Sequence, residues 1–247
     1  MNGQVTLTGM VINAMNVGEY DKRISILTAE RGKISAFAKG ARRQNNSLMA
    51  AVMPFSFGKF TFYEGRTSYN LVQAEISNYF MEIRQDIEKV SYGMYFLELS
   101  DYYTKENNDE KEVLKLLYQS LKALLSEAIP DTLVKSVFEI KIVALNGEIS
   151  HMNECCICHS HEAIVGILPN DGVVVCNNCI NQVNNVHKVS SSAIYTLQFI
   201  IYSKVEKLYT FTVTDMVLDE IKRFSKIYIH KVTGKKLKSE EMLEMFS

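Results

Sequence analysis

The chain has 247 residues, of which 47% are hydrophobic, and its 27 basic and 28 acidic residues leave a formal net charge of −1. This balance is ordinary for a globular protein with a buried core, and it argues against an intrinsically disordered chain. The first residues carry no basic segment followed by an apolar one, and the longest nearly apolar stretch, residues 193–202, is too short and too polar to cross a bilayer, so we expect a cytoplasmic protein.

Five short strands are predicted between residue 4 and about residue 80. They are expected at residues 5–16, 23–29, 33–39, 55–64 and 68–76, with glycines supplying turns or bulges between or within them. Five strands in so short a segment suit a small closed or partly open barrel. The OB-fold is the five-stranded version that binds nucleic acids, and we expect it to form a domain of residues 1–80.

Positive charge is concentrated inside this barrel segment. Residues 20–45 contain seven basic side chains against two acidic ones, a net charge of +5 in a chain whose total is −1. Such a local excess indicates a surface that binds a polyanion, and nucleic acid is the first candidate. The alternative is a charged hairpin that is simply solvated. The basic residues are Lys22, Arg23, Arg31, Lys33, Lys39, Arg42 and Arg43.

The predicted strand at residues 33–39 alternates strictly, which favours the binding interpretation. One face is apolar, and the opposite face is basic with one aromatic ring. The apolar face consists of Ile34, Ala36 and Ala38, and the opposite face of Lys33, Ser35, Phe37 and Lys39. Cationic side chains can follow a phosphate backbone while a ring stacks on an unpaired base. Phe37 is therefore the stacking candidate.

Aromatic residues crowd the next predicted strand. They occupy both of its faces, so most of the rings are expected in the core, and one of the five is expected to remain free for a ligand. The rings are those of Phe55, Phe57, Phe60, Phe62 and Tyr63.

Beyond residue 80 the pattern becomes helical and the charge changes sign. Residues 81–150 carry eight basic and thirteen acidic side chains, a net charge of −5, so this part is expected to be repelled by DNA. Helices are predicted at residues 86–105, 110–128, 131–146, 191–207 and 213–231. Asp131 is the predicted N-cap of the third helix, and Gly147 its stop. A stripe of leucines in the second helix, from Leu114 to Leu125, is assigned to the core.

Four cysteines give the strongest chemical signal. Cys155-x2-Cys158 and Cys176-x2-Cys179 are separated by seventeen residues, and each pair can offer two thiolates to one ion from a tight turn. The spacer, with Gly166 and the turn at residues 170–172, predicts a short hairpin of residues 163–168 and 173–175. We expect a zinc-ribbon-like knuckle at about residues 151–182 holding one structural Zn²⁺. The alternative is four unligated cysteines that serve only packing.

Neighbouring residues offer weaker possibilities. The run from Cys155 to His159 matches the C-x-x-C-H haem-attachment pattern, which a cytoplasmic chain with a second cysteine pair does not favour. Cys156 is a possible nucleophile or alternate ligand, and His159 or His161 a possible substitute for one cysteine. The sequence contains no phosphate-binding Gly-x4-Gly-Lys-Ser/Thr loop, no nucleophile elbow and no His-Glu-x-x-His helix. We therefore expect no enzymatic activity.

Several N-terminal motifs together resemble the RecO family of bacterial recombination and repair proteins. They are Gly18-Glu19-Tyr20-Asp21-Lys22-Arg23, Leu27-Thr28-Ala29-Glu30-Arg31-Gly32-Lys33, Ala38-Lys39-Gly40-Ala41-Arg42-Arg43 and Met53-Pro54-Phe55. The helical remainder, residues 81–247, is similar to the zinc-containing members. The resemblance implies an α+β fold, in which a five-stranded OB-fold barrel is followed by an all-α domain with an inserted four-cysteine zinc knuckle.

The resemblance also implies a recombination mediator in DNA repair, associated with the nucleoid. Such a protein binds single- and double-stranded DNA, anneals complementary strands, associates with RecR, and helps RecA replace single-strand-binding protein (SSB). The family's basic barrel residues correspond to Lys39, Arg42 and Arg43, with Lys33 and Arg23 on neighbouring strands. After Arg43 the uncharged run at residues 44–47 departs from the family's further basic residues, which predicts a smaller DNA footprint.

A pocket for the acidic, Phe-ended tail of SSB is implied in the helical domain. We place it at Lys222, Arg223 and Lys226, which share a predicted helix with apolar residues, although an amphipathic core helix would have the same pattern. Two competing functions stay open. One is a zinc-stabilised OB-fold adaptor that binds protein and has no direct role on DNA, and the other is a nucleic-acid enzyme that depends on divalent metal.

Overall fold

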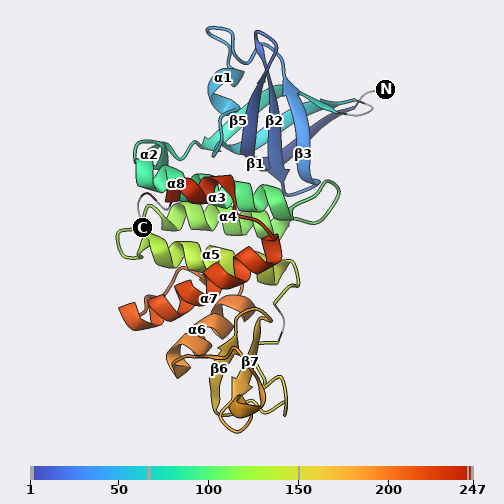
Figure 1. The fold of residues 1–247 in the computed structure, drawn as a ribbon. Helices are drawn as coiled ribbons and strands as arrows, with labels where there is room; N and C mark the ends of the chain where they lie inside the picture. The colour runs from blue at the N-terminus through green and yellow to red at the C-terminus, as the bar shows by residue number, and fades with distance from the viewer. Residues whose placement is uncertain (1–2, 66–67, 150, 244, 246–247) are drawn as a thin grey trace. The chain divides into compact units, whose positions relative to one another are not determined.

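The computed structural model describes residues 3–65, 68–149, 151–243 and 245. It confirms the predicted α+β fold, with a barrel of five strands followed by helices that carry a cysteine-rich insert (Figure 1). The barrel strands are β1 (Gln4–Val17), β2 (Asp21–Thr28), β3 (Gly32–Ala38), β4 (Phe57–Glu64) and β5 (Tyr69–Asn78). A short helix, α1 (Leu48–Ala51), lies between β3 and β4 in the chain.

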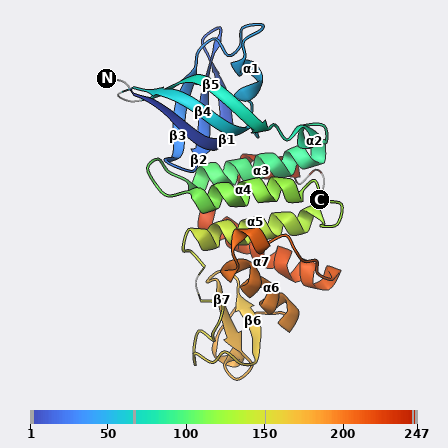
Figure 2. The same ribbon diagram turned by 180° about the vertical axis from the view of Figure 1, so that it is seen from behind.

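The strands close in the order β1-β2-β3-β5-β4, with β4 returning to β1. Every pair is antiparallel except β3 with β5, which run parallel. Seen from behind, β4 lies between β1 and β5 (Figure 2). The long strand β1 pairs with β4 through its first half and with β2 through its second half. This arrangement is the predicted OB-fold barrel.

The barrel core is built by the alternation that the sequence predicts. Ile34, Ala36 and Ala38 of β3 point inward and are at most 1% exposed, and they pack with apolar residues from the other four strands and from α1. The fourth strand begins two residues later than expected, because Phe55 has a positive φ of 72° and interrupts the extended chain. The third ends at Ala38, one residue early, so Lys39 lies in a turn.

The turn between β2 and β3 is held by the segment that follows α3 (Ile87–Tyr103). The backbone N–H of Lys33 donates to the carbonyl of Lys105 at 3.1 Å, and that of Asn107 donates to the carbonyl of Arg31 at 3.0 Å. These bonds fix one end of the barrel against the first helices. The neighbouring helices are α2 (Met81–Arg84) and α4 (Lys111–Ala123).

Helix boundaries follow local capping chemistry. Asp86 caps α3 by accepting hydrogen bonds from the backbone N–H groups of Glu88 and Lys89. In α5 (Asp131–Leu145), the predicted N-cap is wrong by one position: Pro130 is the N-cap and its carbonyl accepts the first helical bonds. The first-turn carboxylate of Asp131 still lies where it interacts favourably with the helix dipole.

Gly147 ends α5 as predicted. Its φ is 75°, its N–H donates to Ala144, and the N–H of Glu148 donates to Val143, which is the Schellman arrangement. The second and fourth predicted helices are shorter than expected. The second ends at Ala123, and the fourth, α6 (Ser191–Tyr202), is followed by a separate 3-10 turn at Val205–Lys207.

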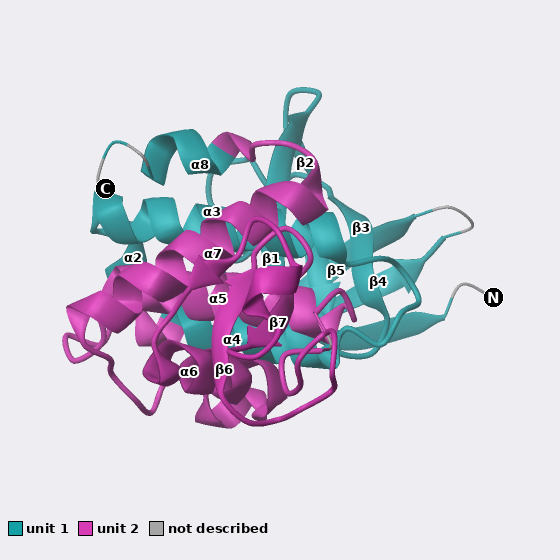
Figure 3. Ribbon diagram, turned by 60° about the horizontal axis from the view of Figure 1, so that its bottom comes forward, with its two compact units in different colours: residues 1–121, 239–247 teal, residues 122–238 magenta. Residues whose placement is uncertain are grey.

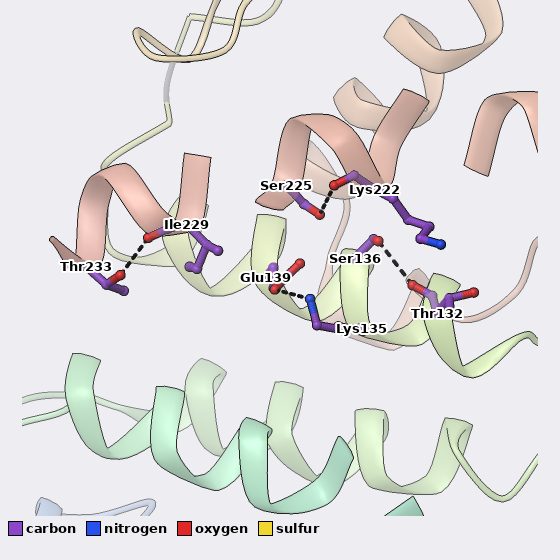
Figure 4. Close-up of polar contacts among 8 residues, drawn as sticks. All are labelled: Thr132, Lys135, Ser136, Glu139, Lys222, Ser225, Ile229 and Thr233. Atoms are coloured by element: carbon purple, nitrogen blue, oxygen red, sulfur yellow. Dashed lines mark hydrogen bonds and ion pairs between the residues drawn. The ribbon is translucent and has the colours of Figure 1, made fainter. Parts of the chain in front are cut away.

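Helices α5, α6 and α7 (Asp215–Thr233) pack against one another. Buried hydroxyl groups in these helices bond to carbonyls of their own helix. Buried Ser136 and Ser225 each donate to a carbonyl within their own helix, and Lys135 forms an ion pair with buried Glu139 at 2.6 Å (Figure 4). Lys141 is also buried, and its ammonium group donates to two carbonyls at the end of α6, where a cation is favourable.

The chain divides into two compact units that are not continuous in sequence. One comprises residues 1–121 and 239–247, and the other residues 122–238 (Figure 3). The last helix, α8 (Lys238–Leu243), belongs mostly to the first unit, where the N–H and hydroxyl of Ser239 donate to the carboxylate of Glu98 at 2.8 and 2.6 Å. Within the described residues, no helix is long and apolar enough to span a membrane.

The cysteine-rich insert contains the predicted hairpin. Its strands are β6 (Ile164–Leu168) and β7 (Val173–Cys176), and a short strand that was not predicted, β8 (His187–Lys188), pairs with the other edge of β6. A 3-10 turn at Ile180–Gln182 follows the last cysteine. The insert is therefore a small three-stranded sheet.

Gly32 offers a test of how the barrel is attached. Its φ is +64°, and an added Cβ would clash with the carbonyl oxygen of Lys105, whereas Gly18 has φ +57° and nothing within 4 Å of that position. A side chain in the left-handed region costs about 1–2 kcal/mol at either site. We expect Gly32→Ala to lower the free energy of unfolding by clearly more than Gly18→Ala, measured by urea denaturation. Equal losses would contradict the described attachment.

Candidate nucleic-acid surface and cysteine cluster

The basic residues of the barrel separate into two groups at opposite ends of β2 and β3. Arg31 and Lys33 lie at the β2–β3 turn and have acidic partners. Arg31 Nη1 is 2.7 Å from Glu64 Oε1, and Lys33 Nζ is 3.1 Å from Asp101 Oδ1. The hydrogen bond from Arg31 to Glu64, with a second one to Tyr69, holds the pKa of Arg31 above its usual value. The positive charge at this end is therefore neutralised locally.

Lys39, Arg42 and Arg43 lie at the other end, after β3, and all three side chains are exposed. Within the described part of the chain, no carboxylate forms an ion pair with any of them. Their segment lies against the turn between β1 and β2, because the N–H of Arg42 donates to the carbonyl of Tyr20 at 2.9 Å. We call Lys39, Arg42 and Arg43 the basic segment.

A row of outward-facing side chains runs across the strands from this end, starting at Arg23 and Phe37 beside the basic segment and ending at Tyr63, next to Glu64. Arg23 of β2 pairs with Phe37 of β3, Phe37 with Asn70 of β5, and Asn70 with Tyr63 of β4. Phe37 is half-buried and lies outside the core cluster, and Tyr63 is 48% exposed. We call these four residues the outer row. Its two rings are two strands apart, a separation of about 10 Å.

The structure thus places most of the predicted DNA-binding residues near one another. Arg23 is exposed, and its Nε donates to the hydroxyl of Ser35 on the neighbouring strand at 2.9 Å. Lys33 faces outward as predicted, but its ammonium group is directed at Asp101, and it also donates to the carbonyl of that residue. Lys33 is therefore not brought together with the basic segment.

The five aromatic residues in and just before β4 divide between the core and the outer face. Phe60 and Phe62 are fully buried, Phe55 is 3% exposed, and the ring of Phe57 packs against Tyr118 with centroids 4.7 Å apart. Tyr63 is the member that points outward. The sequence contained the signal for it, since a residue next to a core position in a strand faces the opposite side.

The four predicted cysteines lie together. Their sulfur atoms are all within 4.8 Å of one another, and the sulfurs of Cys158 and Cys176 are 3.7 Å apart. A tetrahedral shell with metal–sulfur bonds of about 2.3 Å needs sulfur–sulfur separations of about 3.8 Å. Cys155, Cys176 and Cys179 are buried, Cys158 is exposed, and none forms a disulfide. The four side chains can hold a metal ion.

The surroundings of two of the four cysteines shift their thiol pKa values in opposite directions. Burial raises the pKa of the Cys155 thiol, but hydrogen bonds from the backbone at Cys158, Cys176 and Ile157 lower the pKa by more than this, to about 6. Burial raises the pKa of Cys179 to about 12, and its sulfur neighbours contribute. Several thiolates this close repel one another, and a bound cation relieves that repulsion. The donor set therefore fits a closed metal site.

The other candidate ligands lie outside this cluster. His159 Nδ1 is 3.0 Å from a carboxylate oxygen of Glu154, and His161 Nδ1 is 2.9 Å from the carbonyl oxygen of Asn153. Cys156 is exposed, and burial of its sulfur, together with the nearby Cys155, raises the pKa of its thiol. The candidate metal site thus consists of the two C-x2-C pairs, and Cys156, His159 and His161 are not part of it.

Comparison with known proteins settles the family. The model described as "Recombination protein O N terminal" matches residues 1–80, and "Recombination protein O C terminal" matches residues 84–241. The chain belongs to the RecO family. It is 30% identical over 242 residues to the DNA repair protein RecO of Symbiobacterium thermophilum, covering 96% of this chain and 95% of the relative. RecO of Acetivibrio thermocellus is 29% identical over 224 residues, covering 90% and 89%.

The RecO C-terminal match includes α7, where Lys222, Arg223 and Lys226 are exposed. Of these three, Arg223 lines a cavity of about 300 Å³ together with Phe224 on α7 and Lys188 on β8. Asp219 and Glu220 line the same cavity, so its charge is mixed. A larger groove, of about 770 Å³, lies between α6 and the segment before α7 and includes none of the three basic residues.

Tyr20, in the turn between β1 and β2, is a surface residue that the sequence did not indicate as part of the site. Its ring lies under the guanidinium of Arg43, with 5.0 Å between the guanidinium carbon and the ring centroid. No local pattern could reveal this, because the two residues are in different turns. The contact exists only once β1, β2 and β3 are paired in the RecO barrel.

Proposed function

We propose that this RecO-family chain is a DNA-binding recombination mediator in DNA repair. The observation that carries the proposal is the unequal distribution of charge on the barrel. At one end the cations are paired with acids, and at the other the basic segment is exposed beside the outer row. The names of the relatives, which are DNA repair proteins, support the same role.

The surface combines two kinds of contact with nucleic acid. Lys39, Arg42, Arg43 and Arg23 attract phosphates of any sequence, on single strands and on duplexes. Phe37 and Tyr63 can stack on bases only when these are unpaired. The same surface therefore binds both forms of DNA and holds an unpaired strand with its bases accessible, which is what annealing of complementary strands requires.

Mediation needs no chemical step in this account. Screening the repulsion between two phosphate backbones and contacting SSB are both binding events, so we propose annealing without nucleotide hydrolysis. The chain associates with RecR and helps RecA load on SSB-coated single strands. We place the acidic, Phe-ended SSB tail at α7, where Arg223 can pair with its carboxylates and the cavity beside Phe224 can take its terminal ring.

We propose that the cysteine cluster holds one Zn²⁺. Four thiolate ligands suit zinc and leave no open position for water, so the bound ion supplies cross-linking of the insert rather than catalysis. In this proposal residues 1–80 form the nucleic-acid-binding domain, and residues 81–247 the helical domain, with the knuckle at about 151–182. The protein acts in the cytoplasm at the nucleoid.

The metal assignment predicts one zinc ion per purified chain. Cys158→Ser or Cys176→Ser should lose the ion and lower thermal stability, because zinc binding is coupled to folding. Cys156→Ser is the matched control and should keep the ion. Metal content by mass spectrometry and melting curves with and without a chelator measure both effects. Release of the ion by Cys156→Ser alone would overturn the ligand assignment.

Replacing the basic segment by alanine should weaken binding to every DNA sequence. Removing one cation–phosphate interaction reduces the slope of log affinity against log salt by about 0.7 to 0.9, so the triple variant Lys39→Ala, Arg42→Ala, Arg43→Ala should show a shallower slope. The control is Arg31→Ala with Lys33→Ala, which removes cations already paired with Glu64 and Asp101. Mobility-shift titrations at several salt concentrations give the slopes. A control slope that falls as much as the triple variant's would contradict the assignment.

Phe37→Ala should weaken binding to single strands by about 1–3 kcal/mol, if its ring stacks on a base. The salt slope should stay unchanged, since no charge is removed, and duplex binding should change less. Fluorescence anisotropy with labelled single strands and duplexes makes the comparison. A lower melting temperature with unchanged DNA affinity would instead show that the ring serves only packing.

The mediator role predicts that SSB-coated complementary oligonucleotides anneal without added nucleotide. Annealing should require the C-terminal tail of SSB, because the tail recruits the protein to the coated strand. Strand-pairing kinetics with intact and tail-deleted SSB from the same organism provide the measurement. Equal rates would remove the tail contact from the proposal, and no annealing with either would favour a protein-binding adaptor.

A further inference from the structure

The basic segment is attached to the β1–β2 turn through both backbone and side chains. The N–H of Gly40 donates to Asp21 Oδ1 at 2.7 Å, and the N–H of Arg42 donates to the carbonyl of Tyr20 at 2.9 Å. The guanidinium of Arg42 also donates, at 3.2 Å, to the carbonyl of Gly18. These three bonds join two loops that are far apart in sequence.

A fourth contact involves the next arginine. The guanidinium carbon of Arg43 lies 5.0 Å from the centroid of the Tyr20 ring, within the range of a cation–π interaction. Tyr20 is 43% exposed, so the pair lies at the surface. The contact restrains the guanidinium group, and a planar guanidinium can offer N–H groups along one edge to two oxygens of one phosphate.

We propose that Tyr20 and Asp21 are positioning residues that hold Arg42 and Arg43 ready for the phosphates of a nucleic acid backbone. The inference rests on the proposed DNA-binding function and deepens it. A long arginine side chain loses rotamer freedom when it binds, and a support that restrains it beforehand reduces that loss. The turn between β1 and β2 thus contributes to affinity without touching the DNA.

The role of Asp21 can be separated from simple electrostatics by the sign of an effect. An acidic side chain next to a phosphate-binding surface repels DNA, so its removal should tighten binding if charge alone matters. If Asp21 instead holds the loop through Gly40, its removal should weaken binding. Glu19 provides the comparison, because it is exposed in the same turn and has no hydrogen bond or ion pair with any described residue.

The first test compares three variants in the full-length protein, with a 30-nucleotide poly-dT strand as the probe. Asp21→Ala should weaken binding roughly threefold or more, because it removes the acceptor for Gly40. Asp21→Asn keeps an acceptor oxygen but not the charge, and should bind at least as tightly as the unmodified protein. Glu19→Ala should tighten binding slightly. Melting temperatures confirm that all three variants are folded.

The second test addresses the ring. Tyr20→Leu should weaken binding roughly two- to fivefold, the value of an exposed cation–π contact, whereas Tyr20→Phe should retain affinity. In an Arg43→Ala background, Tyr20→Leu should have no further effect, because the side chain it supports is gone. Tyr20→Leu should leave the slope of log affinity against log salt unchanged. Arg43→Ala should reduce that slope by about 0.7, the contribution of one phosphate contact on a single strand.

The outcomes distinguish this inference from the function on which it rests. If the unmodified protein bound DNA with a strong salt dependence but Asp21→Ala tightened binding as Glu19→Ala does, the positioning role would be wrong and DNA binding would stand. Additive effects of Tyr20→Leu and Arg43→Ala would also overturn it. If the unmodified protein did not bind the probe, the proposed function itself would fail.

Discussion

Closure of the barrel constrains which side chains face the core, and this constraint determines most of the candidate DNA-binding surface. Each strand must direct alternate side chains to the core, so Ile34, Ala36 and Ala38 turn inward and Phe37 is left on the outside. Since β3 pairs with both β2 and β5, that outward position is aligned with Arg23 on one side and Asn70 on the other. The outer row is therefore a consequence of strand pairing.

Ion pairs with acidic residues then determine which basic side chains remain free to bind phosphate. Glu64 comes from β4 and Asp101 from α3, and each pairs with a basic residue at the β2–β3 turn. The opposite end has no such ion pairs among the described residues, and there the β1–β2 turn contacts the basic segment through backbone carbonyls, the Asp21 carboxylate, which accepts from an N–H, and the Tyr20 ring. Positive charge is thus left exposed at one end, where its contacts restrain it without neutralising it. This is the property that a phosphate-binding surface needs.

Much of this could be predicted from the sequence, because it depends on local periodicity and spacing. Alternation from Lys33 to Lys39 is a two-residue pattern, and two C-x2-C pairs are sufficient to predict a shared site. What could not be predicted depends on contacts between distant segments. Lys33 and Asp101 are 68 positions apart, and nothing near either residue indicates the pairing. The predicted N-cap of α5, Asp131, is one residue after the observed one, Pro130, because both residues are compatible with the start of a helix.

The central claim is that DNA binds at the end of the barrel where the β1–β2 turn supports the basic segment. Hydrogen–deuterium exchange with and without a single-stranded oligonucleotide tests it most directly, since backbone N–H groups covered or rigidified by DNA exchange more slowly. The account predicts slower exchange in peptides that cover residues 17–22 and 37–46, and little change in those that cover the β2–β3 turn at residues 29–33. Protection confined to the β2–β3 turn or to the cysteine-rich insert would contradict it.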